Sequence, residues 1–161
     1  MVIGYRGQWF ILLTFLIAFA VTYLPLPLWI DRFWPDWVSL VLIYWCMALP
    51  QRVNVGTAWV LGLFQDAAGG ALLGQHALAL AVVAFLTVKT HQRIRVNPLW
   101  QQALSVLGLL IINQLLVSWL NGVIGYPPQN WWYLAPALGG MLWWPWLFIA
   151  LRDLRRRFRI S

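Results

Sequence analysis

Long apolar runs alternate with short polar or proline-containing breaks along almost the whole chain. Most of these runs are long enough for a helix to cross the roughly 30 Å hydrocarbon core of a bilayer. In such a protein lipid covers the apolar surface, and packing between helices supplies specificity. The pattern therefore predicts an all-α membrane protein with a single integral membrane domain over residues 1–161. Six transmembrane helices would form one bundle, at roughly 9–29, 35–49, 54–68, 72–89, 98–123 and 131–151.

The first two runs carry the least regular signals. Arg6, an apolar stretch and Ala18-Phe19-Ala20 mimic a cleavable signal peptide, but the run continues to Leu28 and so favours a spanning helix. The second run, 35–49, covers only about 22 Å as a helix. A span this short is tolerated where neighbouring helices shield its ends or the bilayer thins locally.

Composition and charge support a membrane protein and orient it. Apolar residues make up 62% of the chain and charged residues 9%, against about 25% charged in a soluble domain. The net charge of +7 reflects the positive-inside rule better than a nucleic-acid partner. Six spans place both termini on the side that holds Arg6, Arg52, Lys89, Arg93, Arg95, Arg152, Arg155, Arg156, Arg157 and Arg159, with Arg32 alone opposite. The sequence predicts that both termini are cytoplasmic and that the basic tail meets anionic membrane lipid.

The stretch from Arg52 to Leu80 is the most informative part of the chain, because it is apolar yet rich in glycine and polar residues. If 55–68 is helical, Ala58, Gly62 and Asp66 share one face. Small residues at this spacing let another helix approach closely, and an ionisable residue among them needs a partner. Gly69-Gly70 is expected to end the helix.

Asp66 is the acidic residue that lies inside a hydrophobic span, and three interpretations stay open for it. The favoured one is a packing or capping role, in which its carboxylate bonds the backbone of the turn from Gly69 to Gly74. The second is a contact to a partner helix or a polar ligand, and the third is a proton or ion relay. His76, across the same turn, is a candidate hydrogen-bond partner.

A polar stripe marks the fifth expected span. Asn113, Gln114, Ser118 and Asn121 advance at helical spacing. Buried amides of this kind hold membrane helices together, by about 0.6 kcal/mol on average. Structural packing is the favoured role, and a ligand pocket is the alternative.

The sequence contains no recognised catalytic motif. The sequence contains no Ser-His-Asp set, paired carboxylates, HExxH motif or phosphate-binding loop. Its single cysteine, Cys46, lies in an apolar span and cannot form an internal disulfide. We therefore expect a protein that is not an enzyme and that has no cofactor or metal site.

Several motifs together resemble the MreD family of rod shape-determining inner-membrane proteins, of the proteobacterial type. They are Gly56…Gly62-Leu63-x-x-Asp66-x-x-x-Gly70-x-x-x-Gly74, Pro35-Asp36-Trp37, Leu49–Gly56, Leu99–Ala103 and Trp144-Pro145-Trp146 with its basic tail. The resemblance implies a non-catalytic scaffold of the cell-elongation complex for lateral peptidoglycan synthesis. It also implies binding to the single-span protein MreC and proximity to the RodA glycosyltransferase, the elongation penicillin-binding transpeptidase and the MreB filament. Candidate partner-binding or helix-packing residues are Ala58, Gly62, Asp66, Gly70, Gly74, Asn113 and Gln114.

Two other functions remain as alternatives. The vitamin-capturing S-components of energy-coupling-factor transporters have a similar six-helix architecture, and Asn130, Trp131 and Trp132 are candidate pocket residues under that interpretation. A proton-coupled channel or transporter rests on Asp66 alone. The short, nearly uncharged external loops and the lack of a second intramembrane carboxylate favour the scaffold over both.

Overall fold

Helices account for nearly all of the chain that the structure describes. A computed structural model of the protein describes residues 2–31, 33–50, 52–69, 74–125 and 134–158. Within these ranges the helices are α1 (Val2–Thr22), α2 (Leu28–Asp31), α3 (Trp37–Ala48), α4 (Val55–Gly69), α5 (Gln75–Val96), α6 (Leu99–Ile124) and α7 (Ala135–Arg157). The prediction of an all-α fold is confirmed for this part of the chain.

Helix α3 lies at the centre of the bundle. Every residue from Val38 to Met47 is buried, because α3 contacts α1, α5, α6 and α7. A helix enclosed on all sides has no polar face to present, which explains why its sequence is almost uniformly apolar. Its 12 residues span about 18 Å. The neighbouring helices therefore shield the short second run, as the sequence analysis required.

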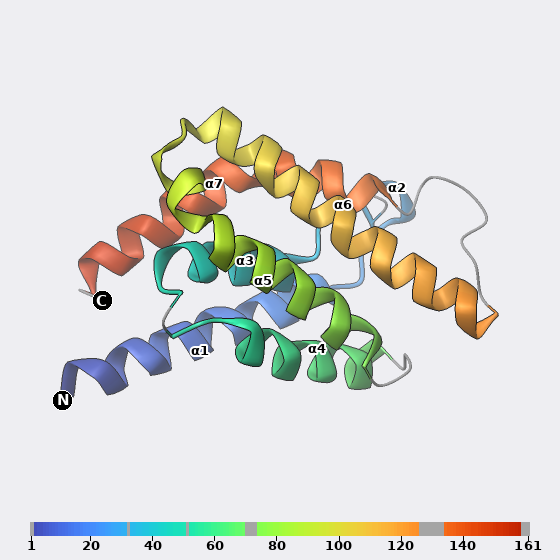
Figure 1. Ribbon diagram of the computed structural model, residues 1–161, viewed down its shortest axis with the longest axis horizontal. Helices are drawn as coiled ribbons and strands as arrows, with labels where there is room; N and C mark the ends of the chain where they lie inside the picture. Colours follow the sequence, from blue (N-terminus) through green and yellow to red (C-terminus); the bar gives the residue numbers. More distant parts are fainter. Residues whose placement is uncertain (1, 32, 51, 70–73, 126–133, 159–161) are drawn as a thin grey trace.

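Long helices that follow one another along the chain run antiparallel, so α5 and α7 run in the same direction as α3 (Figure 1). Helices α4 and α5 form the most extensive pair, and α5–α6 and α6–α7 follow in chain order. Helix α1 packs on α3, where the Trp45 indole Nε1 donates a hydrogen bond to the Thr14 hydroxyl at 3.0 Å. The start of α1 and the end of α7 lie at the same end of the bundle.

The first helix differs from its expected range of 9–29. It begins at Val2 and ends at Thr22, before Pro25, and the short α2 follows Pro27. Proline restricts the residue before it away from the helical region, so Leu24 and Leu26 do not continue α1. Helix α7 runs further than expected, through the basic residues to Arg157.

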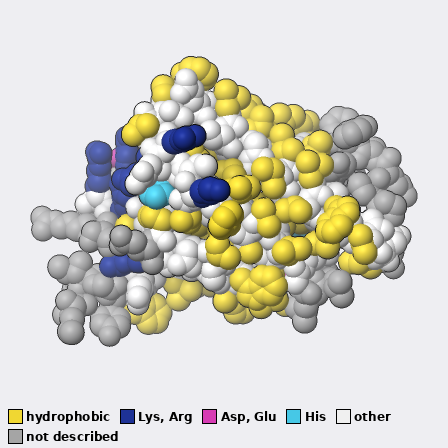
Figure 2. All heavy atoms as spheres, in the orientation of Figure 1, with side chains coloured by type: hydrophobic (Ala, Val, Ile, Leu, Met, Phe, Trp, Pro, Cys, Tyr) yellow, Lys and Arg dark blue, Asp and Glu magenta, His cyan; other side chains and the backbone are white. Residues whose placement is uncertain are grey.

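The outer surface is apolar where a soluble protein would be charged. Large side chains such as Leu16 on α1, Phe64 on α4, Phe85 on α5 and Trp119 on α6 are more than half exposed. Figure 2 shows hydrophobic side chains across most of this face, with Lys and Arg gathered toward the end that holds both termini. Helices α5 and α6 are long and apolar enough to cross a bilayer. Lipid is the solvent that such a surface fits.

Candidate interaction sites

The face formed by Ala58, Gly62 and Asp66 packs inside the protein. Ala58 and Asp66 are fully buried, and α4 lies against α5 along this face. A Cβ added at Gly62 would stand 2.2 Å from the Ala77 Cα atom. Only glycine therefore permits this approach of the two backbones. The sequence left the face open to packing or to a partner, and in the structure α5 occupies it.

Asp66 closes the turn between α4 and α5 and caps α5. Its carboxylate accepts hydrogen bonds from the Gly74 backbone N–H at 2.8 Å and from the His76 backbone N–H at 2.8 Å. The His76 Nδ1 atom lies 2.7 Å from the same carboxylate. Gly74 is the N-cap residue of α5, with a φ of 103°. Because it is a glycine, it has no side chain of its own to cap the helix. We call Asp66, Gly74 and His76 the Asp66 cluster.

In this geometry the Asp66 carboxylate caps α5 and lies against His76, while a role in binding a partner stays a prediction. The free N–H groups and the positive dipole at the start of α5 favour a carboxylate at this position. The hydrogen bonds from these N–H groups offset the cost of burying the charged Asp66 carboxylate. Gly69 is the last residue of α4, as the glycine pair predicted. Gly70 lies outside the described residues.

A second polar group joins α3, α4 and α6 near the same end of the bundle. The Gln65 amide Nε2 donates to both carboxylate oxygens of Asp36, at 3.0 and 3.2 Å. The Ser39 hydroxyl also donates to Asp36, at 2.8 Å, and the Asn113 amide lies 3.5 Å from that hydroxyl. We call Asp36, Ser39, Gln65 and Asn113 the Asp36 cluster. It ties together three helices that are distant in sequence.

The residues of the expected polar stripe on α6 divide between inward and outward positions. Asn113 is buried in the Asp36 cluster, and Asn121 accepts a hydrogen bond from the Gln75 side chain of α5. Gln114 is half-buried, and no side-chain hydrogen bond joins it to the described residues. The stripe thus supplies interhelical bonds at two positions rather than along its whole length.

An apolar groove runs between α1 and α4 on the outside of the bundle. It has a volume of about 690 Å³ and is lined by residues of α1 from Gln8 to Phe15 and of α4 and its preceding turn from Arg52 to Phe64. Along the groove Leu12, Val60 and Phe64 are exposed. We call this feature the α1–α4 groove, and it is a large surface that the described residues leave open.

Neither of the two described clusters has the composition of a metal centre or a catalytic set. Among the residues that the structure describes, no group of three or more His, Cys, Asp or Glu side chains could hold a metal ion. The only described carboxylate that lies against an imidazole is Asp66, and its two oxygens serve the backbone of α5. The hydrogen bonds of the two clusters hold the helices in position relative to one another.

The sequence analysis missed the role of Asp36, which it named only within the Pro35-Asp36-Trp37 motif. Gln65 is separated from Asp36 by 29 positions, so no local pattern reveals their contact. The weak available signal was a second polar side chain, that of Gln65, next to Asp66 on a mostly apolar helix. No pattern in the sequence predicted the α1–α4 groove, because it depends on the distance between two helices in the folded protein.

An apolar exterior, buried and hydrogen-bonded polar clusters and an almost wholly helical described chain define an α-helical integral membrane protein. A family model described as the rod shape-determining protein MreD matches residues 4–154. The Rod shape-determining protein MreD of Haemophilus influenzae is 34% identical over 154 residues, which cover 95% of each chain. The chain belongs to the MreD family of rod shape-determining proteins, which are non-catalytic proteins of the inner membrane.

No solved structure matches this one. The expected likeness to transporter S-components is therefore without support. Asn130, Trp131 and Trp132, on which the vitamin-binding alternative depended, lie outside the described residues.

Proposed function

We propose that the protein is a scaffold of the cell-elongation complex that crosses the inner membrane six times, with both termini in the cytoplasm. The distribution of charge supports this orientation, because Lys and Arg gather at the end of the bundle where α1 begins and α7 ends. The single described domain then has its Asp66 and Asp36 clusters toward the periplasm and its basic helix ends toward the cytoplasm.

In this proposal the α1–α4 groove binds the single membrane helix of MreC. From Gly56 to Phe64 the groove follows α4 for about 12 Å, more than two turns of a docked helix. Its lining is mostly apolar, and Gly56 and Thr57 provide the small side chains that let two membrane helices approach closely. This open, apolar groove is the observation that carries the proposal.

The remaining partners are assigned by position. The basic cytoplasmic end would face the MreB filament, and the exposed apolar sides of α6 and α7 would be available to RodA and to the elongation transpeptidase within the bilayer. Ala58, Gly62, Asp66, Gly74 and Asn113 would serve these contacts indirectly, by holding the helices that form the surfaces. Gln114 and Gly70 are proposed for helix packing on the same basis.

Filling the groove tests this function. A Cβ added at Gly56 would meet only the Asn54 side chain, at 3.5 Å, so Gly56→Leu fits the fold while occupying the groove. Gly108 on α6 faces open space and offers the matched control Gly108→Leu. Tagged protein would be purified from its native membranes in mild detergent and the recovered MreC quantified.

We expect Gly56→Leu to reduce recovery of MreC by about tenfold or more, since about 1.4 kcal/mol of lost packing suffices, and Gly108→Leu to leave it unchanged. Equal recovery of MreC by both variants, with both proteins folded, would contradict docking in the groove. Recovery of paired ATPases and a coupling subunit instead of MreC would favour the S-component alternative.

A further inference from the structure

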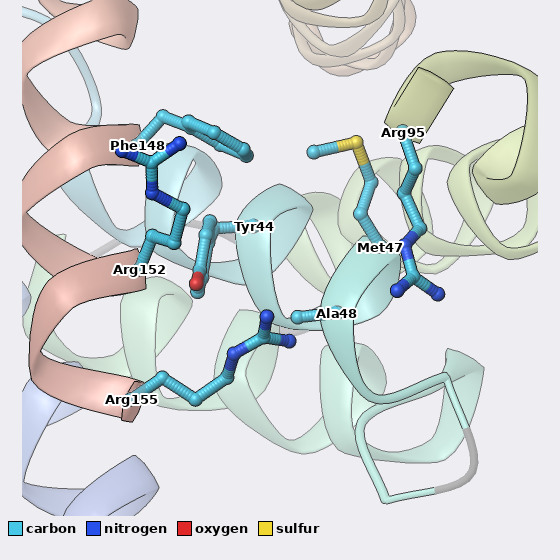
Figure 3. Close-up of a pocket in the computed structure, with 7 residues that line it drawn as sticks. All are labelled: Tyr44, Met47, Ala48, Arg95, Phe148, Arg152 and Arg155. Carbon is cyan, nitrogen blue, oxygen red and sulfur yellow. The ribbon is translucent and has the colours of Figure 1, made fainter. Parts of the chain in front are cut away.

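A small pocket lies at the basic end of the bundle, where α3, α5 and α7 end. It has a volume of about 240 Å³ and brings together Arg95 of α5, Arg152 and Arg155 of α7, and Tyr44 of α3, with Met47 and Phe148 among its apolar walls. Figure 3 shows the two α7 arginines on one side of the pocket and Arg95 on the other, beyond Met47. We call it the arginine pocket.

Tyr44 contributes a buried hydroxyl that has no partner in the described chain. The residue is 2% exposed, and its oxygen neither donates nor accepts a hydrogen bond. Its ring is held by edge contacts to Trp45 and Phe148, so the hydroxyl has a fixed direction. In Figure 3 this oxygen points to the side of the pocket where Arg152 and Arg155 lie. A buried hydroxyl without a partner is unfavourable, and a bound acceptor would relieve that cost.

The three arginines are also poorly neutralised. Within the described residues, the Arg95 and Arg155 guanidinium groups form neither an ion pair nor a side-chain hydrogen bond. Arg152 has a distant contact, 3.9 Å from its Nε to the exposed Asp153 carboxylate, and Nε has no hydrogen-bond partner. Its guanidinium carbon lies 5.7 Å from the centre of the Phe148 ring, which orients the group without neutralising it.

Compensation of helix dipoles does not account for this arrangement. Arg95 and Arg155 lie in the last turns of α5 and α7, where a cation is favourable. Arg152 lies earlier in α7, and the Tyr44 hydroxyl is neutral, so neither serves a helix end. What the four groups share is the ability to donate hydrogen bonds to one anion between them.

We propose that the arginine pocket binds a phosphate group, of the kind that a phospholipid headgroup or inorganic phosphate presents. Arginine forks match the oxygens of phosphate in pairs, and the Tyr44 hydroxyl supplies a further donor from the apolar side. In the orientation proposed above, the pocket opens at the level of the anionic cytoplasmic leaflet. The binding itself does not depend on that orientation and is measured in detergent.

Native mass spectrometry of the full-length protein in a non-ionic detergent tests the proposal. Dioleoylphosphatidylglycerol, dioleoylphosphatidylcholine and inorganic phosphate are titrated separately, and the single-ligand adduct is quantified for each. Phosphatidylcholine carries the same phosphate with a neutralising ammonium, so it separates a site for anionic headgroups from general lipid adhesion. Saturable binding of inorganic phosphate that displaces the lipid identifies free phosphate as the ligand instead.

Paired variants on α7 separate the pocket from general surface charge. Arg152→Gln combined with Arg155→Gln removes two charges from the pocket, while Arg156→Gln combined with Arg157→Gln removes two exposed charges outside it. We expect the first pair to weaken the adduct about tenfold or more and Tyr44→Phe to weaken it several-fold. The second pair should leave it within about twofold, because exposed charges contribute little.

Three results would overturn the proposal. One is a failure of the wild-type protein to form a saturable single adduct with any of the three probes. Another is equal weakening by the two arginine pairs, which indicates a diffuse basic surface. The third is unchanged binding in Tyr44→Phe together with equal retention of phosphatidylcholine and phosphatidylglycerol.

Discussion

The carboxylates at one end of the helical bundle have hydrogen-bond partners within the chain, whereas the arginines and the Tyr44 hydroxyl at the other end lack them in the described residues. Where α4 ends and α5 begins, the Asp66 and Asp36 carboxylates receive hydrogen bonds from backbone and side-chain donors of neighbouring helices. At the opposite end, Arg95, Arg152, Arg155 and the Tyr44 hydroxyl converge on a pocket and lack such partners in the described chain. Polar groups at the first end hold the helices together, and those at the second are left for a molecule outside the chain.

Separating α4 from α5 should have the largest effect on the first end. Gly62→Leu places a side chain on the Ala77 backbone, where a Cβ alone would stand 2.2 Å from the Cα atom. We expect a loss of about 3 kcal/mol or more of unfolding free energy, or failure to accumulate folded protein, because backbone has little room to yield. Unfolding in detergent, followed by tryptophan fluorescence, measures this, with Gly108→Leu as the unaffected control. A small loss for Gly62→Leu would show that the α4–α5 contact is not held as closely as described.

Replacing Asp66 should have the next largest effect on stability. It also distinguishes capping of α5 from a relay or ligand role. Asp66→Leu leaves the partly buried Gly74 and His76 N–H groups without their acceptor, at a cost of up to about 1–3 kcal/mol for each. Asp66→Asn keeps one carbonyl oxygen and should lose roughly half as much. The same unfolding measurement compares them, with Asp153→Asn on the exposed end of α7 as a control for charge. The two variants could instead lower the unfolding free energy equally and differ only in how much partner protein they recover. That result would favour the relay or ligand interpretation of Asp66.

The Asp36 cluster predicts a smaller effect. Gln65→Leu removes the amide that bridges α4 to Asp36, while the Ser39 hydroxyl still donates to the carboxylate. The expected loss is about 0.6–1.7 kcal/mol, the range for interhelical hydrogen bonds in membranes. Gln114→Leu, at a half-buried position where no side-chain hydrogen bond is lost, is the control. Equal stability of both variants would mean that the Asp36 cluster contributes no net binding between helices.

Tyr44→Phe should have the smallest effect on stability and so defines the other end of the comparison. Its hydroxyl has no partner within the described chain, so removing it in detergent without added lipid or phosphate should cost no stability, and relief of the unpaired hydroxyl should leave the unfolding free energy equal or slightly higher. A loss as large as that of Gln65→Leu would show that the hydroxyl already serves the fold.

The sequence was most informative where the chemistry is local. The end of α4 at Gly69 follows from the glycine pair, and capping by Asp66 follows from a carboxylate placed just before a turn that needs an acceptor. Those features involve residues within about ten positions of each other, and short-range rules apply to them.

Contacts between distant helices could not be predicted in the same way. Three features depend on how helices are arranged in space: the bond from Gln65 to Asp36, the occupation of the Ala58–Gly62 face by α5, and the placing of three arginines and Tyr44 around one pocket. The early start of α1 was also missed, because its first residues are less apolar than a spanning run and the expected range began at Trp9. Periodicity identifies helices more securely than it identifies their neighbours.

Site-specific photo-crosslinking in growing cells tests the scaffold function most directly. A photoreactive amino acid would replace Val60, which is exposed inside the α1–α4 groove, or Leu142, which is exposed on α7 and does not line it. The account predicts a strong crosslink to MreC from position 60 and at most a trace from position 142. A crosslink to MreC from position 142 with none from position 60 would contradict it.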